Sequence, residues 1–250
     1  MSEIQVTTFE EFLTACATSG AEVVCPESVV WDMNQIASAG APTVTVACAK
    51  IIGNGTTIAK PSIISRSLFN FTAANAAVSR LNIADFTADT SVITGRVSGV
   101  IWKQSEFNGV QNSGAMVSAY GLTFCEDETA ETPLGCGFTV YLAGGCFFSY
   151  SNGSTLSLRN CKGEFTGGGQ LDPKAGSRNN YLTLRYCFLE GDFTQISLTS
   201  YCGMSIINSP AKRGVYAGAA AQNVPWVDCT EEQLQDAEYL TSIGFTCGRR

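Results

Sequence analysis

The residues of this chain that could carry out chemistry are carboxylates, because histidine is absent from all 250 positions. Without histidine, Ser-His-Asp and Cys-His nucleophile sets and histidine-ligated metals are excluded. Glycoside hydrolysis instead needs two carboxylates, one on either side of the sugar bond. The candidates for such a pair are Glu164, Asp172, Glu190 and Asp192. If segments one repeat apart stack as strands, Glu164 and Glu190 fall on neighbouring strands about 4.8 Å apart.

A polysaccharide lyase would use an arginine base instead, and Arg178 or Arg185 beside a carboxylate-bound Ca²⁺ could fill that role. The alternative is that these charged groups are solvated surface residues, as most charged residues of folded proteins are. We favour this alternative, so the sequence identifies no catalytic residue. Glu164, Glu190, Asp192 and Arg185 remain the candidates if the chain is an enzyme.

No motif indicates a metal or a cofactor. The eleven cysteines include no Cys-x-x-Cys pair, so buried thiols are the simpler interpretation than a zinc site. Segment 126–131 holds four carboxylates but lacks the spaced ligands of a calcium loop, and we expect a solvated loop there. The glycines at 167–169 lack the Lys-Ser/Thr of a phosphate loop. We therefore expect neither a cofactor nor a metal.

Charge and composition argue against two kinds of partner. The formal net charge is −7 and no basic run is present, so we expect no binding to nucleic acid. No stretch approaches the roughly 20 apolar residues of a membrane span, so we expect no membrane insertion. The N-terminal residues show no secretory signal and the cysteine count is odd, which together indicate synthesis in a reducing cytoplasm.

The elements that must position these residues are short strands. Runs such as Val44–Cys48, Val78–Ile83, Leu122–Cys125 and Phe138–Leu142 are apolar or alternate apolar and polar residues, and Gly, Asn, Asp and Ser separate them. Many short strands with almost no helical periodicity between residues 26 and 210 predict an all-β fold.

Repeats favour a parallel solenoid over a sandwich. Similar strand-plus-turn units begin at Leu81, Leu156, Leu182 and Met204, and the last three starts are 26 and 22 residues apart. This spacing is typical of one solenoid coil. Hairpin dipeptides between the runs are few, which weakens the antiparallel alternative.

Aromatic residues in or beside the predicted strands have two interpretations. On a shared outward face they could stack sugar rings or pack against another subunit, whereas stacking inside the coils is the ordinary alternative and the one we favour. The residues are Trp102, Tyr120, Tyr141, Tyr150, Tyr181, Tyr186 and Tyr201.

Both ends of the chain have the pattern of an amphipathic helix. Thr8 and Glu11 have capping-box spacing at the start of a helix predicted over about 8–19, and Thr230 and Gln233 have it before one predicted over about 231–243. A solenoid leaves an open apolar core at each end, which such helices can cap. We therefore predict a β-helix domain at 1–210, including the first helix, and a C-terminal capping tail at 211–250.

Two segments carry a resemblance to a known family. The helix, then Glu22-Val-Val-Cys-Pro26, then Lys50-Ile-Ile-Gly-Asn-Gly-Thr-Thr-Ile58 resembles the start of pectin-lyase-like β-helix proteins. Segment 230–245 is similar to the C-terminal helix of β-helix proteins encoded in phage and prophage tail regions. The resemblance implies a single-stranded right-handed parallel β-helix, the hand that parallel crossovers generally prefer. The absence of histidine departs from the hydrolases of this group that carry one in their site.

The resemblance also implies a function. We expect a phage virion structural protein, tail-associated or surface-exposed, with a role in assembly or host-surface binding. It would be synthesised in the host cytoplasm and act in the virion. Its partners would be other copies of itself, other virion proteins and host surface glycans. Homotrimers are common among such proteins, although the chain has no coiled-coil heptads to specify one. The alternative is a polysaccharide depolymerase, a glycoside hydrolase or lyase acting through carboxylates on the β-helix flank.

Overall fold

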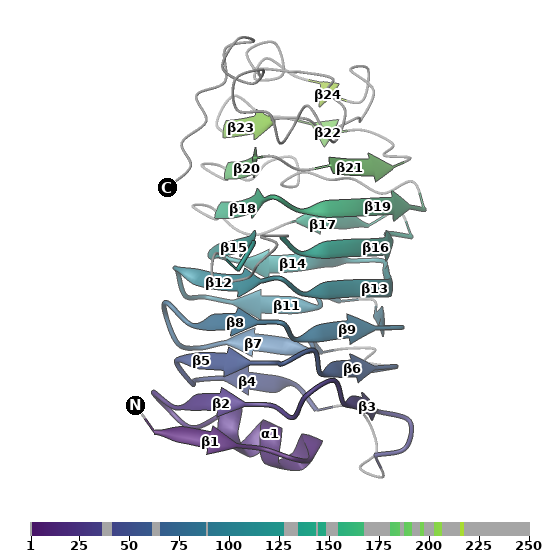
Figure 1. The fold of residues 1–250 in the computed structure, drawn as a ribbon. Coiled ribbons are helices and arrows are strands. Elements are labelled where there is room, and N and C mark those ends of the chain that lie inside the picture. Colours follow the sequence, from purple (N-terminus) through teal and green to yellow (C-terminus); the bar gives the residue numbers. More distant parts are fainter. Residues whose placement is uncertain are drawn as a thin grey trace.

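The computed structural model of the chain describes residues 2–36, 42–61, 66–88, 90–127, 135–143, 145–148 and 155–167, and the backbone of the strands at 181–185, 188–191, 196–197, 203–206 and 216–217. Within these residues every strand pair is parallel. The strands stack coil upon coil as a β-solenoid (Figure 1). The all-β architecture and the parallel stacking predicted from the sequence are therefore confirmed.

Three sheets form the walls of the solenoid in the part of the chain that the structure describes. From the N-terminal end, sheet A contains β1 (Glu3–Gln5), β2 (Glu22–Val24), β5 (Lys50–Ile52), β8 (Ala77–Ser79), β12 (Val100–Lys103), β15 (Gly121–Cys125), β18 (Thr155–Arg159), β20 (Tyr181–Arg185) and β23 (Gly203–Ile206). Sheet B contains β3 (Val30–Asp32), β6 (Thr57–Ala59), β9 (Asn82–Ala84), β13 (Glu106–Asn112), β16 (Gly137–Tyr141), β19 (Lys162–Thr166) and β21 (Phe188–Gly191). Sheet C contains β4 (Val44–Val46), β7 (Phe69–Phe71), β11 (Ile93–Gly95), β14 (Ala115–Ala119) and β17 (Cys146–Phe148). Outside these three paths, β10 (Thr87–Ala88) pairs with β13, and β22 (Ile196–Ser197) pairs with β24 (Tyr216–Ala217).

Alternate side chains of each strand point into the solenoid and build a continuous apolar core. On sheet A one inward position stays aligned from coil to coil, because each strand is in register with the next. Its occupants are Ile4, Val23, Ile51, Val78, Trp102, Phe124 and Leu158. All of them are at most 1% exposed except Ile4, which lies on the outermost strand and is only partly buried. Each coil therefore buries the apolar side chains of its neighbour.

A short corner that recurs along the solenoid joins sheet A to sheet B. Its first residue has a left-handed backbone, with φ of 50° at Arg80, 43° at Gln104 and 53° at Asn160. Its second residue is buried in each case, at Leu81, Ser105 and Cys161. Between β15 and β16 this corner is lengthened to residues 126–136. The acidic segment predicted as a loop therefore begins at a corner, with Glu126 and Asp127 directly after β15.

The cysteines lie in the core. All seven within the described residues are buried, namely Cys16, Cys25, Cys48, Cys125, Cys136, Cys146 and Cys161. Cys136 Sγ donates to the carbonyl oxygen of Trp102 at 3.4 Å. Burial raises the pKa of Cys25 to about 12 and also raises the pKa of Cys16, so both thiols stay protonated at neutral pH. The interpretation of the cysteines as buried thiols is confirmed for these seven.

Aromatic rings fill the middle of the core. Phe138 has ring-centroid distances of 5.3 Å to Phe107, 5.1 Å to Phe124 and 5.2 Å to Phe147. Trp102 is fully buried and lies 5.2 Å from Phe107. Ring pairs at such distances stabilise a fold by about 0.5–1.5 kcal/mol beyond their area burial.

The predicted N-terminal helix is present as α1 (Phe9–Cys16), at the N-terminal end of the solenoid (Figure 1). The capping box is confirmed: Glu11 N donates to Thr8 Oγ1 at 3.2 Å, and Thr8 N donates to the Glu11 carboxylate at 3.2 Å. The apolar face of α1 is buried, and the ring of Phe12 lies 5.2 Å from that of Trp31. Among the described residues no helix is long and apolar enough to cross a membrane.

The second predicted helix, over 231–243, lies outside the described residues, as does the proposed tail at 211–250 apart from β24. Three of the four repeated units do stack, because Leu156, Leu182 and Met204 are register partners on sheet A. The unit beginning at Leu81 is not equivalent, since it leads from a corner into β9 of sheet B. Strands of both sheets alternate apolar and polar residues before a turn, so the sequence pattern does not distinguish the two sheets.

We expect Phe138→Ala to destabilise the fold by about 3–5 kcal/mol, because it removes a ring from the centre of the packed cluster. Equilibrium urea denaturation followed by circular dichroism measures this change. The matched control is Thr139→Ala on the exposed side of the same strand, for which we expect a change within about 0.5 kcal/mol. Equal effects of the two substitutions would contradict the assignment of inward and outward faces.

Candidate functional site

The outward side chains of β13, β16 and β19 form the surface that we consider the candidate site. They alternate with the buried residues Phe107, Phe138 and Phe165, so the core fixes which side chains face solvent. The exposed members, called the polar face below, are Glu106, Asn108, Gln111, Thr139, Tyr141, Lys162, Glu164 and Thr166. Strand pairing holds them at the spacing of one strand per coil, about 4.8 Å.

Glu106 lies over a glycine of the next coil. Glu106 and Gly137 are register partners, and any Cβ at position 137 would overlap the Glu106 carboxylate. Glu106 N donates to Asn82 Oδ1 at 2.9 Å, which ties this end of β13 to β9. The surrounding protein desolvates the carboxylate and raises the pKa of Glu106 above its ordinary value of 4.5.

Tyr141 is the exposed aromatic residue of the polar face, with 48% of its surface open to solvent. A side chain at Gly167 would come within 2.9 Å of Tyr141 Cε2 and 3.0 Å of Cδ2. Gly167 also has φ of +89°, a conformation that L side chains rarely adopt. The glycine therefore makes room for the tyrosine ring to lie against the backbone of the next coil.

The predicted pair Glu164 and Glu190 falls on neighbouring strands. The two are register partners between β19 and β21, and Thr139 precedes them at the same position on β16. Their Cα atoms are therefore about 4.8 Å apart, so the two residues occupy neighbouring positions on successive coils. Glu164 is exposed on the polar face, whereas only the backbone position of Glu190 is described.

The other predicted site residues do not join this surface in the described structure. Asp172, Arg178 and Asp192 lie outside the described residues. Arg185 ends β20 on sheet A, in register with Arg159. It is therefore placed on a different sheet from the Glu164 and Glu190 pair.

Glu126 departs from the expected solvated loop. It is 7% exposed, and its Oε1 lies 2.8 Å from Nε of Arg159, one coil further along. A buried carboxylate needs a hydrogen-bonded cation, and Arg159 supplies it. The first residue of the acidic segment is therefore anchored to the solenoid, while residues 128–131 lie outside the described part.

The predicted aromatic residues divide between core and surface. Trp102 is buried in the core, Tyr120 is half-buried and Tyr141 is exposed. The side chains of Tyr150, Tyr181, Tyr186 and Tyr201 lie outside the described part. The core interpretation is therefore confirmed for Trp102, whereas a binding role for the exposed Tyr141 stays a prediction.

The polar face combines an aromatic ring with carboxylates, amides and hydroxyl groups. A ring packs against the apolar face of a sugar, and the polar groups donate to or accept from its hydroxyls. Within the described residues no group of three or more cysteines or carboxylates is placed to hold a metal ion.

Sequence reasoning did not select Glu106. Its neighbour Gly137 is recognisable only once the register is known, because the insertion at 126–134 separates the two strands in the sequence. In the sequence, the one feature that could have indicated Glu106 is its place as a polar residue at the start of the alternating run 106–112.

Comparison with known proteins gives no assignment. No protein-family model, no curated protein and no solved structure matches the chain significantly.

The raised pKa of Glu106 predicts a pH-dependent stability effect. The folded state binds the proton more tightly than the unfolded chain, so ionisation of Glu106 costs no stability below the unfolded pKa. The full loss of stability is reached once the pH has risen above the raised pKa of Glu106 in the folded state. Glu106→Gln should therefore raise the free energy of unfolding, relative to wild type, by more at about pH 7 than at about pH 3.5. Urea denaturation of both proteins at each pH measures this difference. The same difference at both pH values would contradict the desolvated carboxylate.

Proposed function

We propose that this chain is a structural protein of a phage particle, tail-associated or otherwise surface-exposed, which binds host-surface polysaccharide through its polar face. The observation that carries the binding role is Tyr141, a half-exposed ring supported by Gly167 and set among polar groups. A tyrosine ring offers a large, rigid contact area at low conformational-entropy cost, which suits it to binding.

The shape of the surface supports an extended ligand. The polar face follows the solenoid axis over β13, β16 and β19, so polar groups recur at intervals of one coil, about 4.8 Å. A polysaccharide also repeats along its length. Several weak contacts to successive sugars would then add up to useful affinity through multivalency.

The virion assignment draws on the sequence resemblance to pectin-lyase-like β-helix proteins of phage and prophage tail regions. In this proposal the solenoid is right-handed, and a helix over 231–243 caps its C-terminal end. Copies of the chain assemble with one another, in a trimer or another oligomer, and with other virion proteins. Synthesis takes place in the host cytoplasm before assembly into the particle.

We expect Tyr141→Ala to weaken binding to a host-surface polysaccharide between roughly two- and tenfold, since ring stacking contributes about 0.5–1.5 kcal/mol. A glycan array screened with the purified chain selects the ligand, and titration calorimetry measures the affinity. Tyr141→Phe should keep the affinity within about twofold, because the ring is retained. Ile101→Ala is the matched control, as Ile101 is an exposed apolar residue on sheet A, 36% accessible.

Two outcomes would overturn the proposal. One is equal loss of binding in the Tyr141 and Ile101 variants, or no binding to any glycan of the array. The other is absence of the chain, by mass spectrometry, from particles produced by a strain that encodes it. The first removes the polysaccharide role and the second removes the virion assignment.

A depolymerase is the second candidate, because Glu164 and Glu190 occupy facing positions on adjacent strands. In a hydrolase one carboxylic acid would protonate the leaving oxygen, and the other carboxylate would attack or would activate water. Desolvated Glu106 lies on the same face, two strands from Glu164, and offers a further proton donor.

If the chain is a hydrolase, Glu164→Gln and Glu190→Gln should each reduce the release of reducing ends by about a hundredfold or more. The assay incubates each protein with capsular and cell-wall glycans. Glu27→Gln, which removes an exposed carboxylate from a turn outside the polar face, serves as the control and should leave activity unchanged. No release from any glycan, or full activity in both glutamine variants, would exclude this mechanism.

A further inference from the structure

In the described part of the chain, the strand at the N-terminal end of the solenoid has one edge without a neighbouring strand. Within the described residues β1 pairs with β2 alone, and it is the last strand of sheet A at this end. Ser2 O accepts from Glu22 N at 2.9 Å and Val6 N donates to Val24 O at 3.0 Å. In a parallel strand alternate residues bond to opposite sides. The backbone groups of Glu3 and Gln5 therefore face the open edge.

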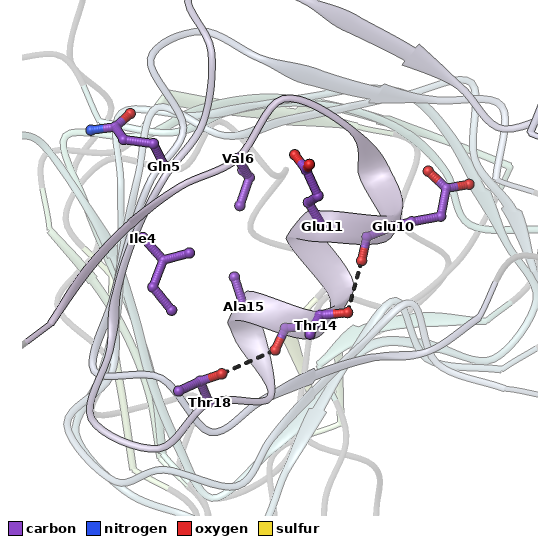
Figure 2. A pocket seen from close by; sticks show the side chains of 8 residues that line it. All are labelled: Ile4, Gln5, Val6, Glu10, Glu11, Thr14, Ala15 and Thr18. Atoms are coloured by element: carbon purple, nitrogen blue, oxygen red, sulfur yellow. Dashed lines mark hydrogen bonds between the residues drawn. The ribbon is translucent and has the colours of Figure 1, made fainter.

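A pocket lies directly beside this edge. It has a volume of about 460 Å³ and lies between the β1 segment and α1 (Figure 2). Ile4, Val6 and Ala15 form its apolar part, and Glu10 and Glu11 line it from the helix. Ile4 belongs to the inward column of sheet A and is only partly buried, whereas Val23 and Ile51 behind it are fully buried. The pocket is therefore where the next side chain of that column would fit.

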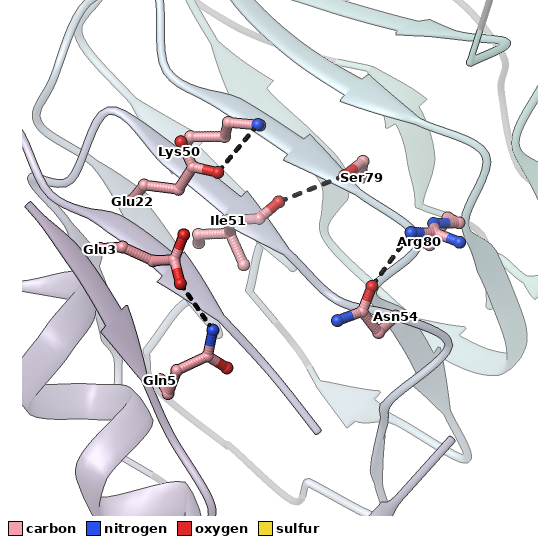
Figure 3. Close-up of polar contacts among 8 residues, drawn as sticks. All are labelled: Glu3, Gln5, Glu22, Lys50, Ile51, Asn54, Ser79 and Arg80. Atoms are coloured by element: carbon pink, nitrogen blue, oxygen red, sulfur yellow. Dashed lines mark hydrogen bonds and ion pairs between the residues drawn. The ribbon is translucent and has the colours of Figure 1, made fainter. Parts of the chain in front are cut away.

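The negative charge of the N-terminal end of the solenoid favours a cationic partner. Residues 1–49 contain six carboxylates and neither lysine nor arginine. On the outward face Glu3 accepts from Gln5 Nε2 at 2.8 Å, and Glu22 is paired with Lys50 at 3.0 Å (Figure 3). Among the described residues Glu3 and Glu10 form no ion pair, and both are exposed. Two copies meeting through this end would repel each other, whereas a cationic segment would be attracted.

We propose that β1 is a docking strand for an extended basic segment of another protein, which adds one further strand to sheet A. An apolar residue of that segment fills the pocket beside Ile4, and the lysines or arginines on either side of it point to the outward face and lie near Glu3. Main-chain hydrogen bonds to Glu3 and Gln5 supply affinity, and the pocket supplies specificity, as in strand addition generally. This docking is independent of glycan binding by the polar face, which is a different surface.

The probe is an acetylated and amidated heptapeptide of alternating residues, Lys-Val-Lys-Ile-Lys-Val-Lys, labelled for fluorescence anisotropy with the whole chain. We expect saturable binding that slows amide hydrogen exchange at Glu3 and Gln5. The amides of β3, the edge strand of sheet B, serve as an internal control and should not change. Glu3→Gln should weaken binding roughly three- to tenfold, because Glu3 is exposed on the outward face of β1, where the lysines of the added strand lie.

Gln5→Pro removes an amide that faces the open edge, while the bonds from β1 to β2 remain. It should reduce peptide binding at least about tenfold with unchanged thermal unfolding. If this variant fails to fold, a peptide N-methylated at its valines and isoleucine, whose amides would face β1, gives the same test on the wild-type chain. Binding of that peptide, or equal binding of a charge-reversed or order-scrambled peptide, would overturn the proposal, as would unchanged exchange at Glu3 and Gln5.

Discussion

The structure depends on in-register stacking of parallel strands. Each coil obtains its backbone hydrogen bonds and its buried apolar contacts from the coils on either side, so a single coil has no stability of its own. The column from Val23 to Leu158 on sheet A shows this dependence, since each of its members is covered by those before and after it. The same constraint determines the surface. With Phe138 turned inward, Thr139 must face solvent.

Two glycines create the space in which the functional side chains of the polar face lie. In a stacked sheet every outward side chain contacts the side chains one coil away, so a position without a Cβ leaves space for its neighbour. Gly137 leaves space for the Glu106 carboxylate and Gly167 for the Tyr141 ring. In both cases one coil supplies the functional group and the next supplies the room for it. The candidate site is therefore a property of pairs of coils.

The sequence allowed prediction of features that depend on one coil or on equal spacing between coils. The Thr8 capping box is local, and the 26-residue spacing of Glu164 and Glu190 matches one coil, which places them in register. Glu126 and Arg159 were not predicted to pair, because they are 33 residues apart across an insertion. Such a contact depends on the length of the inserted segment, which no periodicity in the sequence reveals. The prediction that the unit at Leu81 is equivalent to the other three was wrong, because a repeat pattern does not show which sheet a strand joins.

The lengthened corner at 126–136 lies where the stacking of the strands tolerates an insertion. Across the lengthened corner at 126–136, β15 still pairs with β18 and β13 with β16, so both sheets continue without interruption. Gly135 N donates to Asn160 O at 2.9 Å, which brings the chain back to the regular corner before β16 begins. The ion pair of Glu126 with Arg159 holds the start of the insertion, and this hydrogen bond holds its end. A solenoid anchored in this way can change its corner segments beside the polar face without altering the core that positions Tyr141 and Glu106.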